Sequence, residues 1–113
     1  MAFACDKLEW TAGALYQTDA SLSIAGNVVE LERPIHFPTL ASPVIGTERG
    51  KGTVDSNGRV VIDANWASAR RQYKARYEGV LNTRGGTLTG HQDWVSDGKP
   101  FNNRKCTLTV TRR

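Results

Sequence analysis

The residue pair best suited to chemistry is His91 and Asp93, which are separated by one position. In an extended strand, residues two apart share a face, so the carboxylate could orient the imidazole or share a metal ion with it. A metal site would need a third ligand at a recognisable spacing, and His36 lies in a distant, proline-containing segment. We therefore expect no metal and treat the pair as candidate binding residues on an exposed strand face.

Motifs of the common catalytic sites are absent from the sequence. There is no Gly-x-Ser-x-Gly nucleophile elbow, no Gly-Lys-Ser/Thr phosphate loop and no His-Glu-x-x-His metal helix. Carboxylates such as Glu30, Glu32 and Asp63 are expected on outer strand faces, where they discourage pairing with other molecules. The sequence predicts a protein without catalytic activity and without a cofactor.

Basic residues interleaved with aromatic ones form the main candidate binding surface. Single-stranded nucleic acid binds where cations and stacking rings share one side, as in OB-fold barrels. In a strand over 72–81, however, Tyr73 and Tyr77 point opposite to Lys74 and Arg76, which favours core positions for the rings. We predict a protein, an envelope component or a small ligand as the partner, bound through the proline-rich loop and the strand-end loops, with single-stranded nucleic acid on the basic strand as the alternative. The candidate binding residues are Trp66, Arg70, Arg71, Lys74, Arg76, His91 and Asp93.

These residues must be positioned by short strands that glycine turns separate. Segments 21–25 and 28–35 flank Gly26-Asn27, and segments 51–54 and 59–63 flank a turn that ends in Asn57-Gly58. Both turns contain residues that tolerate the positive φ of a hairpin. Alternation continues over 72–81, 87–95 and 105–112. We predict an all-β fold, an antiparallel β-barrel or β-sandwich of about six to eight strands, because either arrangement shortens exposed edges.

Three segments have a less regular pattern. Residues Leu8 to Tyr16 fit either a strand or a short helix, and we favour the strand. Three prolines over 34–50 predict a long connection at one end of the fold, either a loop that contributes to binding or a plain crossover between sheets. Asn65 to Arg71 has room for one helical turn.

The two cysteines, Cys5 and Cys106, lie near opposite ends of the chain. They lack the spacing of redox and zinc motifs, which leaves buried thiols or a disulfide, and we predict the disulfide. It would close a loop of roughly 100 residues and contribute about 4 to 5 kcal/mol through the entropy of the unfolded chain. Such a bond is typical of an oxidising compartment.

Length and charge set further limits. The 113 residues allow one domain over the whole chain, and we expect a monomer. The net charge of +4 suits an acidic partner but also serves solubility. No apolar run approaches the ~18 residues that span a bilayer. Ala2-Phe3-Ala4 fits the small-x-small pattern of signal peptidase, so we expect a mature N-terminus near Cys5 and a periplasmic or secreted location.

The last third of the chain is similar to a group of known proteins. The runs 77–81, 86–94 and 106–110 resemble the final three strands of small, mostly uncharacterised secreted β-proteins of Gram-negative bacteria. The resemblance implies a periplasmic or secreted location and a disulfide. It supplies no functional residue.

Overall fold

Nine strands make up the part of the chain that the computed structural model describes, which is residues 2–5, 15–17, 21–36, 44–67 and 71–111. Most strands are longer than expected. They are β1 (Ala2–Cys5), β2 (Leu15–Gln17), β3 (Ser21–Ala25), β4 (Val28–His36), β5 (Val44–Val54), β6 (Arg59–Ala67), β7 (Arg71–Asn82), β8 (Gly85–Ser96) and β9 (Lys99–Thr111).

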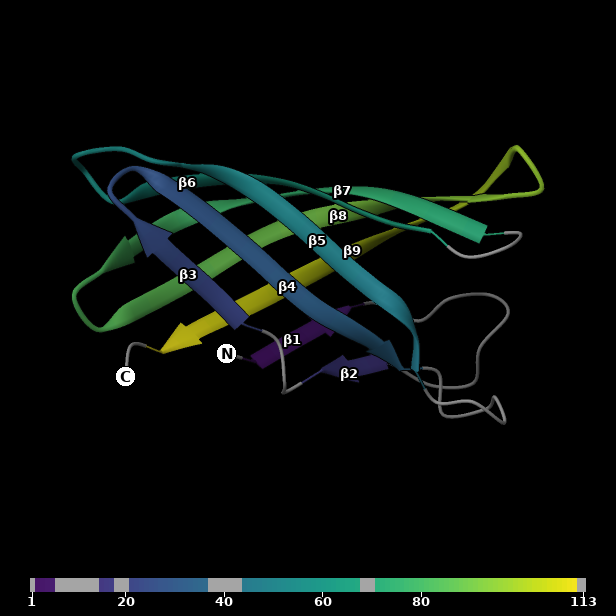
Figure 1. The fold of residues 1–113 in the computed structure, drawn as a ribbon, viewed down its shortest axis with the longest axis horizontal. Helices are drawn as coiled ribbons and strands as arrows, with labels where there is room; N and C mark the ends of the chain where they lie inside the picture. The colour runs from purple at the N-terminus through teal and green to yellow at the C-terminus, as the bar shows by residue number, and fades with distance from the viewer. Residues whose placement is uncertain (1, 6–14, 18–20, 37–43, 68–70, 112–113) are drawn as a thin grey trace.

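The strands form a single sheet in the order β2-β1-β9-β8-β7-β6-β5-β4-β3. From β3 to β9, each strand pairs antiparallel with the next one along the chain, which makes a meander (Figure 1). The first strand, β1, adds to the far side of β9 and also pairs with β2. The prediction of an all-β antiparallel fold is confirmed.

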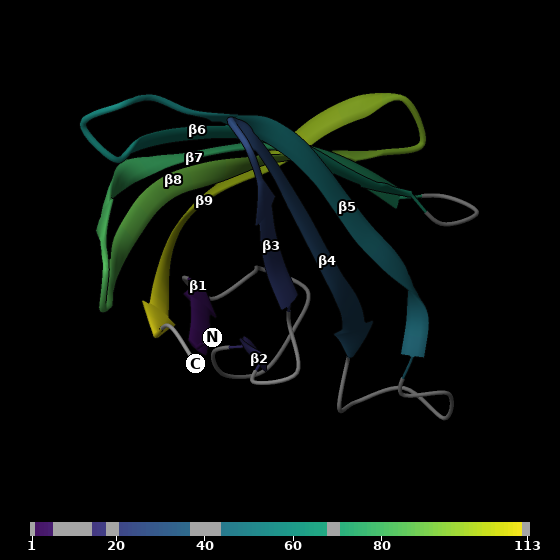
Figure 2. The same ribbon diagram turned by 60° about the vertical axis from the view of Figure 1, so that its left-hand side comes forward.

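The sheet curls around its own concave face, and the strands that the structure describes do not close it into a barrel (Figure 2). A barrel needs a ladder between the first and last strands of the sheet. Here β2 and β3 are the two edges, and the strand order does not bring them together as hydrogen-bonded neighbours. The predicted closed barrel is therefore corrected to one open, curled sheet, and the alternative of two packed sheets does not apply.

Glycines on β5 allow a close approach between β5 and β6. A Cβ atom at Gly50 would lie 2.9 Å from the Cβ of Ala64 and 2.9 Å from the Cγ2 of Ile62. A Cβ at Gly52 would lie only 1.8 Å from the backbone oxygen of Val61. Glycine in a strand often marks such an approach or a bend in the sheet. Because Gly50 and Gly52 have no side chains, β5 can lie close to β6 and the sheet can curl over the core at these strands.

Both predicted hairpins are present. Gly26 has a φ of 62° in the turn between β3 and β4. In the turn between β5 and β6, the Oδ1 atom of Asp55 accepts hydrogen bonds from the backbone N–H groups of Asn57 (2.9 Å) and Arg59 (3.0 Å). An aspartate that binds its own backbone in this way fixes the turn and hence the register of the strands that follow.

The predicted long connection over 34–50 is wrong for most of its length. Strand β4 continues through Pro34, which is opposite Thr47 of β5, and the register shifts between Pro34 and His36. Proline is tolerated in a strand at such an irregularity, because a ladder hydrogen bond is already lost there. Only 37–43 fall outside the described residues. Likewise, β6 runs to Ala67, so 65–67 are strand rather than helix, while 68–70 and most of 8–16 are not described.

Strict alternation divides the sheet into an inner, concave face and an outer face. Along β6 and β7 every second residue is buried, and the predicted inward positions of Tyr73 and Tyr77 are confirmed. Ile24 is opposite the buried Val29 and so faces the same side, but it is 50% exposed because β3 is an edge strand. The apolar core consists of Val29, Leu31, Val60, Ile62, Ala64, Trp66, Tyr73, Ala75, Tyr77, Leu88, Trp94, Cys106 and Leu108.

Candidate functional site

Four of the seven candidate binding residues meet on the outer face of β7 and β8. In the register, Lys74 is directly opposite Asp93, and Arg76 is directly opposite His91. All four are exposed, as the alternation of both strands predicts. Side chains opposite one another on adjacent antiparallel strands have Cβ atoms about 5 Å apart, so the backbone places these four side chains side by side.

The pair Arg76 and His91 belongs to a longer row across the strands. Lys105 of β9 is opposite His91, so Arg76, His91 and Lys105 follow one line perpendicular to three strands. We call these three residues, of which Arg76 and Lys105 carry the fixed positive charges, the cationic row. On the other side of Arg76, Asp63 of β6 continues the line. The row exists because antiparallel pairing keeps every second residue of each strand on one face.

A shallow hollow of about 490 Å³ lies over the cationic row and opens to solvent. It extends beyond the row to hydroxyl and amide side chains, and one carboxylate is included. Its lining consists of Arg76, Glu78, Thr89, Gly90, His91, Asn103, Lys105, Cys106 and Thr107.

Two aspartates contact the side chains of Arg76 and His91. Arg76 donates from Nε to Oδ1 of Asp63 (2.9 Å), and this hydrogen bond together with the charge of Asp63 raises the pKa of Arg76. The Nε2 atom of His91 lies 3.5 Å from Oδ2 of Asp93, whose other oxygen accepts a hydrogen bond from Asn103. Asp63 and Asp93 thus hold Arg76 and His91 from the two flanks, while neither carboxylate lines the hollow.

The chemistry available in the hollow is binding of an anion. The basic side chains of Arg76 and Lys105 outnumber the single acid, Glu78, and His91 adds a third nitrogen donor. His91 and Asp93 are both about half exposed, and in the described part of the chain no cluster of three potential metal ligands occurs. The hollow can supply charge and hydrogen-bond donors to an acidic group.

The other candidate binding residues lie elsewhere. Trp66 is 2% exposed on the inner face, where its ring stacks on Tyr73 at 5.6 Å and packs against Trp94 at 5.4 Å. Arg71 starts β7 and is in phase with Tyr73, which places it on the inner side as well. Arg70 lies outside the described residues. The mixed basic and aromatic surface that the sequence indicated is therefore divided between the two faces.

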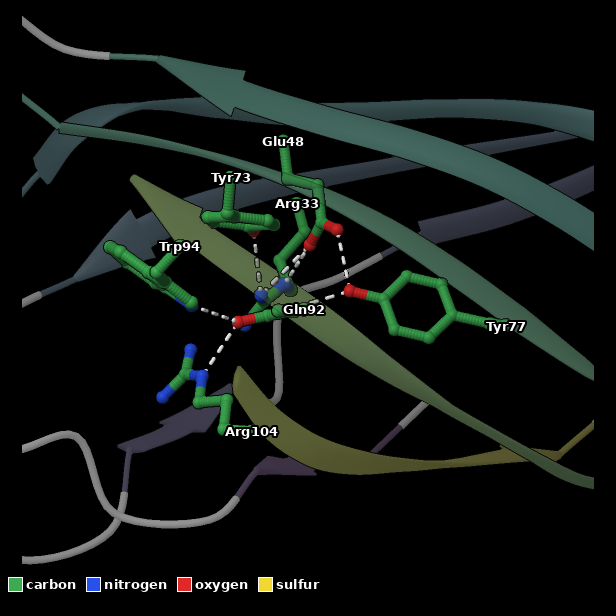
Figure 3. Close-up of polar contacts among 7 residues, drawn as sticks. All are labelled: Arg33, Glu48, Tyr73, Tyr77, Gln92, Trp94 and Arg104. Carbon is green, nitrogen blue, oxygen red and sulfur yellow. Dashed lines mark hydrogen bonds and ion pairs between the residues drawn. The ribbon is translucent and has the colours of Figure 1, made fainter. Parts of the chain in front are cut away.

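The inner face also carries a polar cluster that sequence reasoning missed. Seven side chains, which we call the buried network, are linked by hydrogen bonds, ion pairing and ring contacts at one end of the core (Figure 3). Their exposed fractions are at most 2%. The members are Arg33, Glu48, Tyr73, Tyr77, Gln92, Trp94 and Arg104.

Glu48 is one centre of the buried network. Its Oε1 atom accepts a hydrogen bond from Nε of Arg33 at 2.8 Å, and its Oε2 atom accepts one from the hydroxyl of Tyr77 at 2.6 Å. Arg33 also donates to the hydroxyl of Tyr73 at 3.1 Å. A buried carboxylate is tolerated when it is paired and hydrogen-bonded in this way.

Gln92 is the second centre. Its Nε2 atom donates to the hydroxyl of Tyr77 at 3.0 Å, and its Oε1 atom accepts from Nε1 of Trp94 (3.0 Å) and from Nε of Arg104 (2.6 Å). The guanidinium of Arg104 also lies 5.2 Å from the centre of the Trp94 ring, a cation–π contact. Gln92 therefore joins β7, β8 and β9 through a single amide.

Burial determines how the groups of this network ionise. Burial raises the pKa values of Tyr73 and Tyr77 well above their ordinary value, and the nearby charge of Glu48 raises them further. Burial lowers the pKa of Arg104 to about 10. For Arg33, burial acts in the same direction, but the charge of Glu48 and its hydrogen bond outweigh it, so the pKa is raised. At neutral pH both guanidinium groups are therefore charged and both phenols neutral.

A sequence signal for the buried network does exist. Arg33 is in phase with Val29 and Leu31, and Arg104 is in phase with Cys106 and Leu108. Charged residues at such positions are usually read as strand ends or loops, because single charges are rarely buried. Their burial becomes understandable only from the partners on neighbouring strands, Glu48 of β5 for Arg33 and Gln92 of β8 for Arg104.

Comparison with protein-family models, with curated proteins and with solved structures gives no match for this chain. Among the described residues, no helix has the length and apolar character needed to cross a lipid bilayer. The functional conclusion therefore depends on the geometry of the outer face.

Proposed function

We propose that this protein is a non-catalytic binding module that works in the periplasm or outside the cell and captures an anionic partner on its outer sheet face. The observation that carries the proposal is the register that aligns Arg76, His91 and Lys105 over one hollow. Partners of this kind include an acidic protein, an acidic component of the cell envelope and a small anion.

Electrostatics support this choice of surface. The net charge of +4 draws anions toward the protein, and the hollow concentrates basic side chains at one place. Because Asp63 and Asp93 anchor Arg76 and His91 from outside the hollow, less side-chain freedom is lost when a ligand binds.

The alternative partner, single-stranded nucleic acid, receives less support. Such surfaces combine cations with exposed rings on which bases stack. The rings of Trp66, Tyr73, Tyr77 and Trp94 are all at most 2% exposed and lie on the face opposite the cationic row. Among the residues that the structure describes, the cations of the outer face therefore lack a stacking surface beside them.

The register also supports the predicted disulfide. Cys5 of β1 is directly opposite Cys106 of β9, so the backbone brings the two residues side by side. We propose that they are bonded and that the protein matures in an oxidising compartment. Intact mass after alkylation of the unfolded, unreduced protein from its native host counts the free thiols. No alkylation supports export, whereas two modified thiols contradict it.

Calorimetric titration with inorganic polyphosphate tests the binding surface. The double variant R76Q/K105Q removes two positive charges from the hollow, and the double variant K51Q/R59Q removes two from the same outer face outside it. Each exposed contact contributes up to about 1 kcal/mol, so we expect R76Q/K105Q to weaken binding by about fivefold or more relative to the control. Equal affinities of the two variants would show that attraction is diffuse and would overturn the proposal.

A further inference from the structure

We propose that the anionic partner is an acidic polysaccharide that lies across strands β7, β8 and β9, with its carboxylates along the cationic row. This inference rests on the proposed function and names the ligand class of the same site. Three parallel rows of side chains on the outer face support it, because each row suits a different part of such a ligand.

The central row sets the spacing and direction of the ligand. Adjacent strands are about 4.8 Å apart, so Arg76, His91 and Lys105 span about 10 Å at the level of their Cα atoms and more at their tips. A polymer of uronic acids carries one carboxylate on every sugar, and the length of a sugar unit is on the scale of the distance between strands. Two or three consecutive sugars thus suit the row.

A second row suits the uncharged part of such a ligand. Glu78, Thr89 and Thr107 are opposite one another on the same three strands, directly beside the cationic row, and all three line the hollow. Two hydroxyl groups and one carboxylate at the surface exchange hydrogen bonds with sugar hydroxyls, in the roles that these groups usually take.

The third row lies on the other side of the cationic row. Lys74, Asp93 and Asn103 are opposite one another, and Asn103 lines the hollow while it donates a hydrogen bond to Asp93. The cationic row is thus flanked by the hydroxyl groups of Thr89 and Thr107 and by the amide of Asn103. This arrangement suits a chain that alternates acidic groups with hydroxyl groups. A nucleic acid would instead require rings on this face, and the described rings are buried on the other.

Titration with galacturonate monomer, dimer and trimer tests the inference. Each added unit engages one more residue of the cationic row, so we expect the affinity to rise by about two- to fivefold per unit up to the trimer. The matching galactose oligomers should bind far more weakly because they lack carboxylates. No rise with length, or equal binding of the neutral oligomers, would overturn the inference. Tighter binding of an oligothymidylate would overturn it in favour of nucleic acid.

Two pairs of threonine variants separate the sugar-binding role from general attraction of anions. T89V/T107V removes the two hydroxyls of the hollow without changing shape, and T87V/T109V makes the same change on the same strands outside the hollow. We expect only T89V/T107V to weaken trigalacturonate binding, while polyphosphate binding is unchanged. If neither pair has an effect but R76Q/K105Q still weakens polyphosphate binding, the polysaccharide is excluded and the proposed function stands. If R76Q/K105Q matches its control with both ligands, both proposals fail.

Discussion

Replacing Glu48 by glutamine should destabilise the protein far more than the same change at Glu32. The two residues belong to neighbouring cross-strand pairs of β4 and β5, Arg33 with Glu48 and Glu32 with Arg49. The first pair is at most 2% exposed, whereas the second has side chains that are 70% and 52% exposed. Both pairs join an arginine and a glutamate across the same two strands, and burial is the main difference.

The magnitude follows from what each substitution leaves behind. Glu48→Gln keeps the shape of the side chain but leaves the guanidinium of Arg33 buried without its counter-ion, which costs about 3 to 5 kcal/mol. It also replaces the charged acceptor of the 2.6 Å bond from Tyr77. Glu32→Gln breaks a solvated pair that contributes about 0.2 to 1 kcal/mol, because water solvates the remaining arginine.

Urea unfolding followed by tryptophan fluorescence measures the difference, with the m-value confirming that both variants unfold in the same manner. Glu48→Gln should lower the free energy of unfolding by at least about 2 kcal/mol more than Glu32→Gln. Arg33→Met combined with Glu48→Leu should recover much of the loss, because the unpaired charge is gone. Equal losses for the two single variants would refute the view that burial makes the inner pair costly to break.

Two further predictions concern the core and the sheet. The raised pKa values of Tyr73 and Tyr77 stabilise the fold below pH ~10, where free tyrosine is neutral, and this contribution is lost as the pH rises toward the folded-state values. Absorbance titration of phenolate should therefore show both residues ionising only as the protein unfolds, and a native protein in which both ionise near pH 10 would contradict this. Gly52→Ala should destabilise the sheet by about 1 to 3 kcal/mol in urea unfolding, because its Cβ would lie 1.8 Å from the backbone oxygen of Val61. Thr53→Ala, on the exposed face of the same strand, is the control, and equal losses would exclude the close approach as the cause.

Local patterns predicted much of the sheet. Alternation over 72–81, 87–95 and 105–112 assigned the faces of three strands, including the outward positions of Arg76 and His91. Turn chemistry placed the two hairpins, since Gly26 and the segment 55–58 determine backbone geometry within a few residues. Both signals depend on sequence neighbours alone, which is why they are readable without the fold.

What could not be predicted depends on partners far along the chain. The three prolines over 34–50 suggested a loop. Instead, pairing with β5 accommodates Pro34 at a register shift and places Arg33 beside Glu48. Lys105 completes the cationic row only because β9 pairs with β8 in one register. The sheet also stays open because its two edge strands, β2 and β3, are not paired with each other. The periodicity of a strand carries no information on such pairing.

The place of β1 beside β9 has a consequence for the order in which the chain folds. The ladders from β3 to β9 join sequence neighbours, so each can form soon after its turn, with little entropy lost in closing the loop. The ladder between β1 and β9 instead joins segments about 100 residues apart, and its docking site does not exist until β9 has been laid down. As the chain emerges from its N-terminal side, β1 is thus available before β9 but docks only after it, and β1 stays unpaired with β9 while the meander assembles.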